Sequence, residues 1–280
     1  MYRCYSCGRQ ILDTQRVNLD ELWCLYSSGK QTYFQLAERF FCSPETIQRW
    51  LDKVLIIRCK EFSGVAVVIM DTTYFGRGFG VMVFKNSLDG VVLYKEYVRY
   101  ETNALYLAGI SEISRRGIGV QAIVCDGRQG LFGLFEDIPV QMCQFHQIQI
   151  VLRYLTRKPK TQAAAELKKL TLKLTKQSKE SFVNNLNIWH LRWDDYLNER
   201  SKSSSTGKTY YTHKRLRSAY LSLKKHLPYL FVFEEYPNLN IPNTTNALDG
   251  QFADLKNKLR NHNGLSKARK MKFIDGFFKA

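Results

Sequence analysis

The sequence predicts an α/β fold with a mixed β-sheet core, a helical region inserted late in the chain, and two short helices ahead of the core. Three observations lead to this prediction. Five strand-like runs, with one clear helix among them, lie between residues 64 and 145. Two of these runs end at an aspartate, and residues 147–280 are mainly helical in pattern and strongly basic. The chain therefore divides into a short helical start, a sheet and a large helical part.

Composition limits the classes of protein to which the chain can belong. Its 280 residues suffice for one large domain or for two to three modest ones. They include 42 Lys and Arg against 25 Asp and Glu, which gives a formal net charge of +17 and an isoelectric point near 9.6. So many positive charges on a compact chain repel one another, and binding to a polyanion reduces this repulsion. Nucleic acid is the usual polyanionic partner of such a basic protein.

The sequence carries no signal of a membrane or secreted protein. No uninterrupted apolar run has transmembrane length, no lipidation signal is present, and the N-terminus has no apolar signal-peptide core. Seven scattered cysteines, an odd number, do not suit a secreted disulfide framework. We therefore expect a cytoplasmic, nucleoid-associated protein without a membrane partner.

Residues 1–15 contain one Cys-x2-Cys pair, Cys4 and Cys7, which is typical of the second knuckle of a zinc ribbon. A ribbon needs two such knuckles, because structural Zn²⁺ takes four ligands. We therefore expect this incomplete site to bind Zn²⁺ only if a further knuckle is present. A chance spacing with no metal is the alternative.

Residues 16–60 predict short helices joined by a tight turn, the design of a helix-turn-helix DNA-binding domain. Ser43 is a suitable N-cap for the second helix, and Pro44 suits its first position, where the missing N–H costs nothing. Three polar residues on the outward face of this helix are expected to contact DNA: Thr46, Gln48 and Arg49. A helical hairpin that only packs on its neighbours is the alternative.

Residues 61–146 are expected to form the first part of the sheet core. An apolar run over residues 64–70 suits a strand buried on both faces, and it ends at Asp71. Runs at residues 79–85 and 91–97 flank a turn-rich connection and predict a hairpin.

A helix and two further strands complete this part of the core. Thr102 can cap a helix that runs to Arg116. A fourth strand at residues 120–125 ends at Asp126, and a fifth at residues 140–143 leads to His146.

The order of three strands, helix, strand, helix and strand is that of a ribonuclease H-like core, in which the first and fourth strands are neighbours. Asp71 and Asp126 would then converge. Carboxylates suit Mg²⁺ or Mn²⁺, and two such ions can clamp the attacking and leaving oxygens of a phosphodiester. For either aspartate taken alone, a turn former or helix cap is the alternative.

A third carboxylate is expected within residues 241–280, where an amphipathic helix follows the cap-type residues 243–246. Asp249 lies in the first turn of this helix and is the candidate for a third Mg²⁺ ligand. Asp254, further along the same helix, is the alternative.

Four motifs together resemble those of the Mutator-like transposase superfamily, and more narrowly its bacterial insertion-sequence branch. The motifs are Asp71-Thr-Thr, Asp126-Gly, Cys143-Gln-Phe-His146, and Asn243-Thr-Thr-Asn-x2-acid followed by a basic helix. The resemblance covers residues from about 64 to 275. It implies a DDE triad carried by Asp71, Asp126 and Asp249, and a helical insertion at residues 147–240 before the third acid.

The resemblance also carries three narrower implications. The family's usual third acid is Glu, so Asp249 is one methylene shorter than the pattern expects. Cys143 and His146 match the family's C-x2-H element and are expected beside the catalytic site. Some members of this branch carry an N-terminal zinc ribbon, which would make this chain an N-terminally truncated copy.

Basic residues are concentrated in two segments. Residues 153–176 carry eight Lys and Arg, and residues 256–272 carry seven. Lys256, Lys258 and Arg260 follow directly on the expected third acid and are predicted to bind DNA phosphates. Residues 153–176 follow soon after the fifth strand, so they either contact DNA or form a solvated helix face. Residues 202–208 are expected to form an exposed loop.

The predicted function is that of a DNA transposase that cleaves and joins insertion-element ends by two-metal-ion phosphoryl transfer. Its partners would be terminal inverted repeats and target DNA, with at least a dimer needed to pair two ends. A ribonuclease H-like nuclease without strand transfer is one alternative. A catalytically decayed or domesticated copy that only binds DNA is the other.

Overall fold

The computed structural model describes residues 2–3, 5–8, 10–11, 17–56 and 62–278. The chain forms two compact units, one of Met1–Cys59 with Ala253–Ala280 and the other of Lys60–Phe252. The segment 241–280, which the sequence groups with the catalytic core, is thereby divided between the two units after Phe252.

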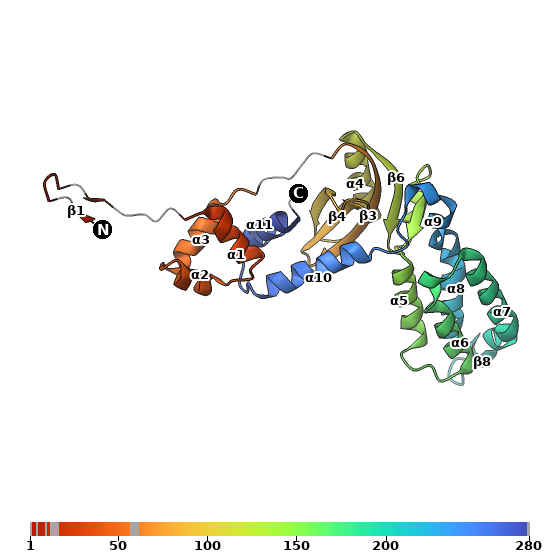
Figure 1. The fold of residues 1–280 in the computed structure, drawn as a ribbon. Helices are drawn as coiled ribbons and strands as arrows, with labels where there is room; N and C mark the ends of the chain where they lie inside the picture. The colour runs from red at the N-terminus through yellow and green to blue at the C-terminus, as the bar shows by residue number, and fades with distance from the viewer. Residues whose placement is uncertain (1, 4, 9, 12–16, 57–61, 279–280) are drawn as a thin grey trace. The chain divides into compact units, whose positions relative to one another are not determined.

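The larger unit is built on a five-stranded mixed sheet (Figure 1). Its strands are β3 (Gly64–Tyr74), β4 (Gly80–Asn86), β5 (Val92–Val98), β6 (Ile118–Cys125) and β7 (Val140–Met142). They are ordered β5-β4-β3-β6-β7, with β3 antiparallel to β4 and parallel to β6. The first and fourth strands of the sheet are therefore neighbours, so the predicted ribonuclease H-like core is confirmed.

Strand β3 is longer than predicted, because it does not end at Asp71. Its pairing with β6 stops at Ile69, whereas its pairing with β4 continues through Asp71 to Tyr74. Thr72, Thr73 and Tyr74 are good strand formers, which explains the extension. Asp71 consequently lies where one side of β3 is paired and the side toward β6 is open.

A second expectation about the core is also wrong. The helix predicted between the fourth and fifth strands is only a short 3₁₀ turn, η1 (Phe132–Leu134). The connection from β6 to β7 is too short and too rich in glycine for a full helix, since Gly127, Gly130 and Gly133 all lie within it.

Helix α4 (Asn103–Arg115) begins at its N-cap Thr102, as predicted, and packs closely on the sheet. The approach depends on Gly109, because a Cβ atom at this position would lie 2.1 Å from Cζ of Phe84. Tyr106, Ile110 and Ile113 are buried in the interface.

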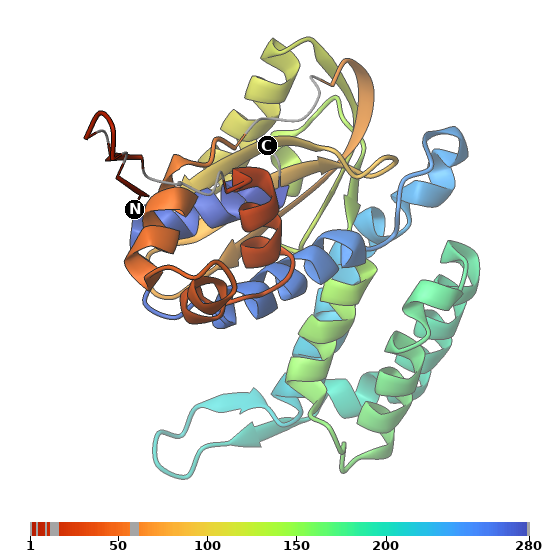
Figure 2. The same ribbon diagram turned by 60° about the vertical axis from the view of Figure 1, so that its left-hand side comes forward.

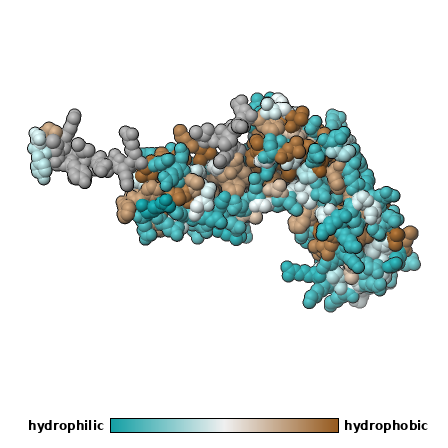
Figure 3. Space-filling view, in the orientation of Figure 1, coloured by the Kyte–Doolittle hydropathy of each residue, from teal (hydrophilic) through white to brown (hydrophobic). Residues whose placement is uncertain are grey.

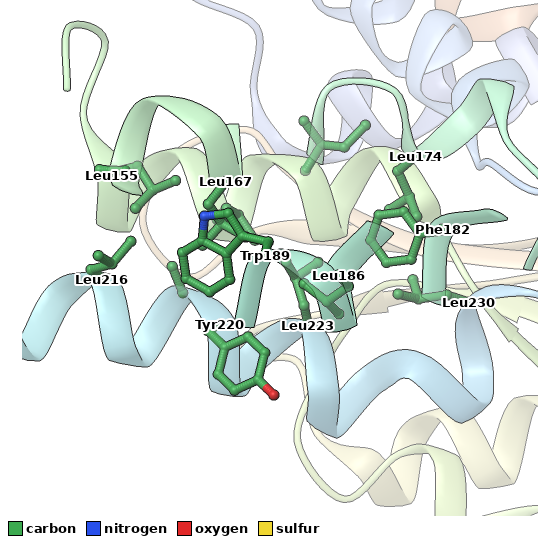
Figure 4. Packing of buried hydrophobic residues seen from close by; sticks show 14 of the residues in the cluster. Leu155, Leu167, Leu174, Phe182, Leu186, Trp189, Leu216, Tyr220, Leu223 and Leu230 are labelled. Carbon is green, nitrogen blue, oxygen red and sulfur yellow. The ribbon is translucent and has the colours of Figure 1, made fainter. Parts of the chain in front are cut away.

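The segment between β7 and the third acid is a helical insertion, as predicted. Its elements are α5 (Gln144–Leu155), α6 (Gln162–Thr171), η2 (Leu174–Lys176), α7 (Lys179–Asn198), β8 (Arg200–Lys202), β9 (Thr209–Tyr211), α8 (Lys214–Leu230), α9 (Val232–Glu235) and η3 (Pro237–Leu239). Phe182, Leu186, Trp189 and Leu223 belong to its own apolar core (Figure 4). The predicted exposed loop is the tip of the β8–β9 hairpin, which projects from the helices (Figure 2).

Two buried glutamines fasten the insertion to the sheet. The side-chain amides of Gln141 and Gln144 both donate hydrogen bonds to the Leu230 carbonyl, at 2.9 and 2.8 Å. Oε1 of Gln141 accepts a hydrogen bond from the backbone N–H of Phe233. The C-terminal end of α8 is thus held against β7 and the start of α5.

The smaller unit contains α1 (Leu19–Ser27), α2 (Tyr33–Arg39), α3 (Pro44–Lys53), α11 (Lys267–Phe278), the second half of α10 (Asn246–Arg260) and the pair β1 (Tyr2–Arg3) and β2 (Gln10–Ile11). Trp23 and Tyr26 of α1 pack against Phe273 of α11. The predicted start of α3 is confirmed, because the Ser43 side chain accepts a hydrogen bond from the Thr46 N–H and Pro44 occupies the first turn.

The residues predicted to contact DNA from α3 differ in their surroundings. Arg49 is exposed and donates a hydrogen bond to Thr46 Oγ1 at 3.0 Å. Gln48 is already engaged, because its Oε1 accepts a 2.9 Å hydrogen bond from Arg269. Their role in binding DNA stays a prediction. Cys4 lies outside the described residues, so the predicted zinc pair with the exposed Cys7 is not tested.

Across the described residues, none of the helices combines the length and the apolar character that crossing a membrane requires.

Candidate active site

Asp71, His146 and Asp249 converge at one edge of the sheet. One side-chain ligand atom from each of the three lies within 4.8 Å of those of the other two. Asp71 comes from β3, His146 from the first turn of α5, and Asp249 from the first turn of α10. Residues far apart in the sequence thus form one cluster of metal-ligand types.

The backbone connections at this edge explain the convergence. The N–H of Cys143 donates to the Cys125 carbonyl at 2.8 Å, which places the end of β7 beside the end of β6. The next N–H, that of Gln144, donates to the Asn243 carbonyl at 2.9 Å. The start of α5 is therefore tied to the segment that leads into α10.

Thr245 connects the third acid with the Cys-x2-His element. Its hydroxyl lies 2.9 Å from Oδ2 of Asp249 and 3.3 Å from Sγ of Cys143, and 3.5 Å from Nδ1 of His146. Its backbone N–H also donates to Cys143 Sγ, and the side chain is fully buried. The sequence shows Thr245 only as one of four cap-type residues, so its position at the centre of the site was missed.

Burial and neighbouring negative charge set the electrostatics of Asp71. Burial raises the pKa of this carboxyl, and the charges of Asp249 and Asp126 raise it further. The hydrogen bond from the Thr72 N–H, at 2.7 Å, and the charge of His146 act in the opposite direction. The balance raises the pKa of Asp71 to about 7 in the metal-free chain.

Cys143 and His146 shift each other's protonation. Burial raises the pKa of the Cys143 thiol, but hydrogen bonds with His146 and Thr245 outweigh this effect and leave the pKa below its ordinary value. The hydrogen bond with Cys143 raises the pKa of His146 to about 9, against the opposing effect of burial. The negative charges of Asp71 and Asp249 add to this rise. The metal-free site therefore favours a protonated imidazole beside its carboxylates.

Asp126 follows directly on β6 but is not part of the three-residue cluster. Its Oδ1 accepts a hydrogen bond from the Arg128 N–H at 3.1 Å. Its charge acts on Asp71, which places it close to the site. The assignment of Asp126 as a metal ligand stays a prediction.

Arg128 holds the loop that carries Asp126. Its guanidinium donates to Asn103 Oδ1 at 2.7 Å and to the Glu101 carbonyl at 2.9 Å, and it lies 3.7 Å from the Glu101 carboxylate. All these contacts fix the loop to the start of α4.

A buried chain of hydrogen bonds leads from the same glutamate to Asp71. Tyr106 donates its hydroxyl proton to Glu101 at 2.7 Å, so it accepts at 3.0 Å from the Thr72 hydroxyl. Burial raises the pKa of Tyr106 well above its ordinary value, which keeps this hydroxyl protonated. Thr72 in turn holds Asp71, so the two predicted catalytic aspartates share one supporting network.

The donor set fits a divalent cation. Burial, and then the charges of Asp249 and Asp126, raise the pKa of Asp71, and a bound cation would offset both effects by favouring the ionised carboxylate. Carboxylate oxygens suit Mg²⁺ and Mn²⁺, whereas an imidazole nitrogen favours Mn²⁺ over Mg²⁺ among these two. The arrangement can thus hold such an ion through Asp71, Asp249 and His146.

The other predicted residues of α10 have different partners. Asp254, the alternative third acid, forms an ion pair with Lys258 at 2.9 Å. Lys258 also lies over the Phe277 ring, 5.0 Å from its centroid. Arg260 is exposed, and Lys256 is half-buried. Their contact with DNA stays a prediction.

No protein-family model and no curated protein matches the chain. A chain of the Drosophila P element transposase strand transfer complex aligns over 98% of this chain and 93% of its own length, at 13% identity and a TM-score of 0.44. A chain of the simian T-cell lymphotropic virus intasome in complex with PP2A regulatory subunit B56 gamma aligns over 63% and 64%, at 14% identity and a TM-score of 0.24. At these scores the fold rests on the strand order itself.

Proposed function

We propose that the chain is a DNA transposase that cleaves and joins the ends of an insertion element by metal-dependent phosphoryl transfer. The convergence of Asp71, Asp249 and His146 at the edge of a ribonuclease H-like sheet carries this proposal. The net charge of +17 supports a polyanionic substrate. We place the chain in the Mutator-like superfamily and its insertion-sequence branch on the four sequence motifs.

In this proposal Asp71, Asp126 and Asp249 hold two Mg²⁺ or Mn²⁺ ions, with His146 as a further donor. When bound, the ions activate water or a 3′-hydroxyl for in-line attack and stabilise the leaving 3′-oxygen. Neighbouring groups of the chain orient the carboxylates that would bind the metal ions. The Thr72 N–H orients Asp71, and the Thr245 hydroxyl orients Asp249.

The remaining parts of the proposal concern DNA recognition. Helices α2 and α3 would act as a helix-turn-helix that binds the terminal inverted repeats through Thr46, Gln48 and Arg49. Two copies would pair two ends, and the chain would act in the cytoplasm at the nucleoid.

A cleavage assay tests the catalytic proposal. The full chain is incubated with element-end DNA and Mg²⁺ or Mn²⁺, and the products are separated on a sequencing gel. We expect cleavage that Asp71→Ala and Asp249→Ala abolish. Asp254→Ala is the matched control and should retain cleavage, because its carboxylate pairs with Lys258. Cleavage that survives Asp71→Ala would refute the proposed site.

The same gel separates the transposase from its alternatives. Joined products that contain target DNA indicate strand transfer, whereas cut ends alone indicate a nuclease with the same triad. Specific binding without cleavage in either metal indicates a DNA-binding protein that has lost its catalytic activity.

A further inference from the structure

The helical insertion carries a strongly basic surface at the end that lies away from the sheet. Two segments form it, residues 153–160 at the end of α5 and residues 200–217 across the β8–β9 hairpin and the start of α8. The first contains four Lys and Arg, the second contains six, and neither contains an acid. We call these two segments the distal basic surface. Hydrophilic residues cover this end of the insertion (Figure 3).

The two segments lie together in the structure. Arg215 donates a 2.6 Å hydrogen bond to the Arg153 carbonyl, which joins the start of α8 to the end of α5. Nine of the ten basic residues are exposed. In the described part of the chain none of the ten forms an ion pair, and the adjacent Glu199 is held by His213 at 2.8 Å. The positive charge is therefore unneutralised.

Two of the guanidinium groups are held in fixed positions. Arg200 and Arg217 both stack on the Tyr211 ring, with Cζ atoms 4.3 and 4.1 Å from its centroid. Arg200 also donates to the Tyr211 hydroxyl, and Arg217 donates to Oδ1 of Asn198. Such bracing lowers the entropy that the side chains lose when they bind an anion. Tyr210 in the same hairpin is half-exposed.

The distance from the catalytic edge follows from helix geometry. Helix α8 has 17 residues, so Lys214 lies about 25 Å along the axis from Leu230. Leu230 accepts hydrogen bonds from Gln141 and Gln144, directly beside the element that carries His146. Along α5, Arg153 lies seven residues, or about 10 Å, beyond His146. Duplex DNA rises about 3.4 Å per base pair, so the surface begins about three base pairs from the catalytic edge and its hairpin end lies about seven base pairs away.

We infer that the distal basic surface binds the phosphate backbone of duplex DNA from about three to about seven base pairs from the phosphodiester at the catalytic edge, with the β8–β9 hairpin at the far end. The surface combines exposed, unpaired cations with braced guanidiniums, which suits phosphate contacts rather than base readout. The inference rests on the proposed DNA substrate, but it does not depend on the cleavage chemistry.

Salt titration of DNA binding tests the inference. The full chain binds a fluorescein-labelled 30-base-pair duplex in EDTA, and anisotropy gives the affinity from low to moderate salt. We expect the triple variant Arg200→Gln, Lys202→Gln and Lys208→Gln to reduce the log–log salt slope by up to about 2.7. The matched control is Lys169→Gln, Lys173→Gln and Lys176→Gln, which removes the same charge from exposed positions in α6, in η2 and in the turn between them. It should keep the wild-type slope.

A charge-retaining variant separates charge from folding. Arg200→Lys, Lys202→Arg and Lys208→Arg should keep the wild-type salt slope, because the number of positive charges is unchanged, and all variants should show a cooperative thermal melt. An equal reduction of the salt slope in both glutamine variants would overturn the inference, because the net charge of the chain alone would then explain the reduction. The inference would also be overturned if the glutamine variant of the hairpin bound duplex DNA as the wild type does but no longer bound phosphatidylglycerol vesicles. The surface would then bind a membrane rather than DNA.

Footprinting tests the position once the cleavage assay has located the scissile phosphate. Hydroxyl-radical protection about seven base pairs away should disappear in the glutamine variant of the hairpin and persist in the control. If the wild type binds with the expected slopes but never cleaves, the catalytic proposal fails and the inference stands. If protection persists in both variants, the inference fails and the catalytic proposal stands.

Discussion

Ionisation of Asp71 lowers the folding stability of the metal-free chain, and the size of this effect depends on pH. An aspartate in the unfolded chain ionises near pH 3.9, whereas Asp71 in the folded chain has a pKa of about 7. Between these values the unfolded chain binds fewer protons than the folded chain, so stability falls as pH rises. The full loss of stability is reached above pH 7.

We therefore expect Asp71→Asn to stabilise the metal-free protein at pH 8 by about 2–4 kcal/mol, and by much less at pH 5. Urea denaturation in EDTA at the two pH values measures the difference. Asp254→Asn serves as the comparison variant, because Asp254 lies outside the cluster of Asp71, His146 and Asp249 and pairs with Lys258. A stabilisation of equal size at both pH values would contradict the assigned cause.

Thr245 positions Asp249 through a hydrogen bond that valine cannot form. Thr245→Val keeps the shape of the side chain but removes contacts to Asp249, Cys143 and His146. Outer contacts of this kind change activity by about 10- to 100-fold. We expect this loss in cleavage rate for Thr245→Val, with most of it restored by Thr245→Ser.

Thr244→Val is the matched control for this test, because among the described residues Thr244 forms no side-chain hydrogen bond with the site. The metal dependence of the rate should shift to higher Mn²⁺ concentration in Thr245→Val, and in no other variant of the set. A purely structural effect would lower the melting temperature and leave the metal dependence unchanged.

At the scale of elements, the contact between α4 and the sheet depends on Gly109. A Cβ atom at this position would meet the Phe84 ring at 2.1 Å, and this ring is fully buried. Overpacking a close contact costs about 1–3 kcal/mol, and this overlap places Gly109→Ala at the upper end. Gly133→Ala meets no atom within 4 Å and should be neutral. Chemical denaturation of both variants tests the difference.

The strands were predictable because each has a simple pattern. The apolar run before Asp71, the turn-rich hairpin and the run before Asp126 all describe buried strands with short connections. The extension of β3 to Tyr74 was not visible, since Asp71 interrupts the apolar run although its pairing with β4 continues. The β8–β9 hairpin was missed because its strands have only three residues each.

The candidate site was predictable only in part, for a related reason. Asp71 and Asp249 carry local signals, one at an apolar run and one in the first turn of an amphipathic helix. His146 was expected beside the site only through the resemblance of its C-x2-H motif. Thr245 reaches the site through contacts with residues about one hundred positions away, and no local pattern shows such a contact. The sequence therefore identified the carboxylates better than it identified the groups that hold them.

At the scale of the whole molecule, the division into two units separates metal binding from the N-terminal helices. Asp71, His146 and Asp249 all lie in the unit Lys60–Phe252. A fragment of residues 60–260, which retains all of α10, should therefore bind Mn²⁺. Ligand binding raises stability in proportion to the logarithm of ligand concentration, so its melting temperature should rise with added Mn²⁺.

The corresponding measurement is a thermal melt of the fragment and of the full chain across a series of Mn²⁺ concentrations. The same fragment with Asp71→Asn is the control and should show no rise. A fragment that folds but does not respond to Mn²⁺ would show that the site needs residues outside this range.

The contact between Thr245 and Cys143 joins residues 102 positions apart, and it has a consequence for the order of events during synthesis. A ribosome adds roughly 5–20 residues per second, so Cys143 emerges roughly 5–20 seconds before Thr245. The sheet and much of the insertion can fold during this interval, while the third carboxylate is still missing. A nascent chain is thus unable to complete the cluster of Asp71, His146 and Asp249 until residues 245–249 have emerged from the ribosome.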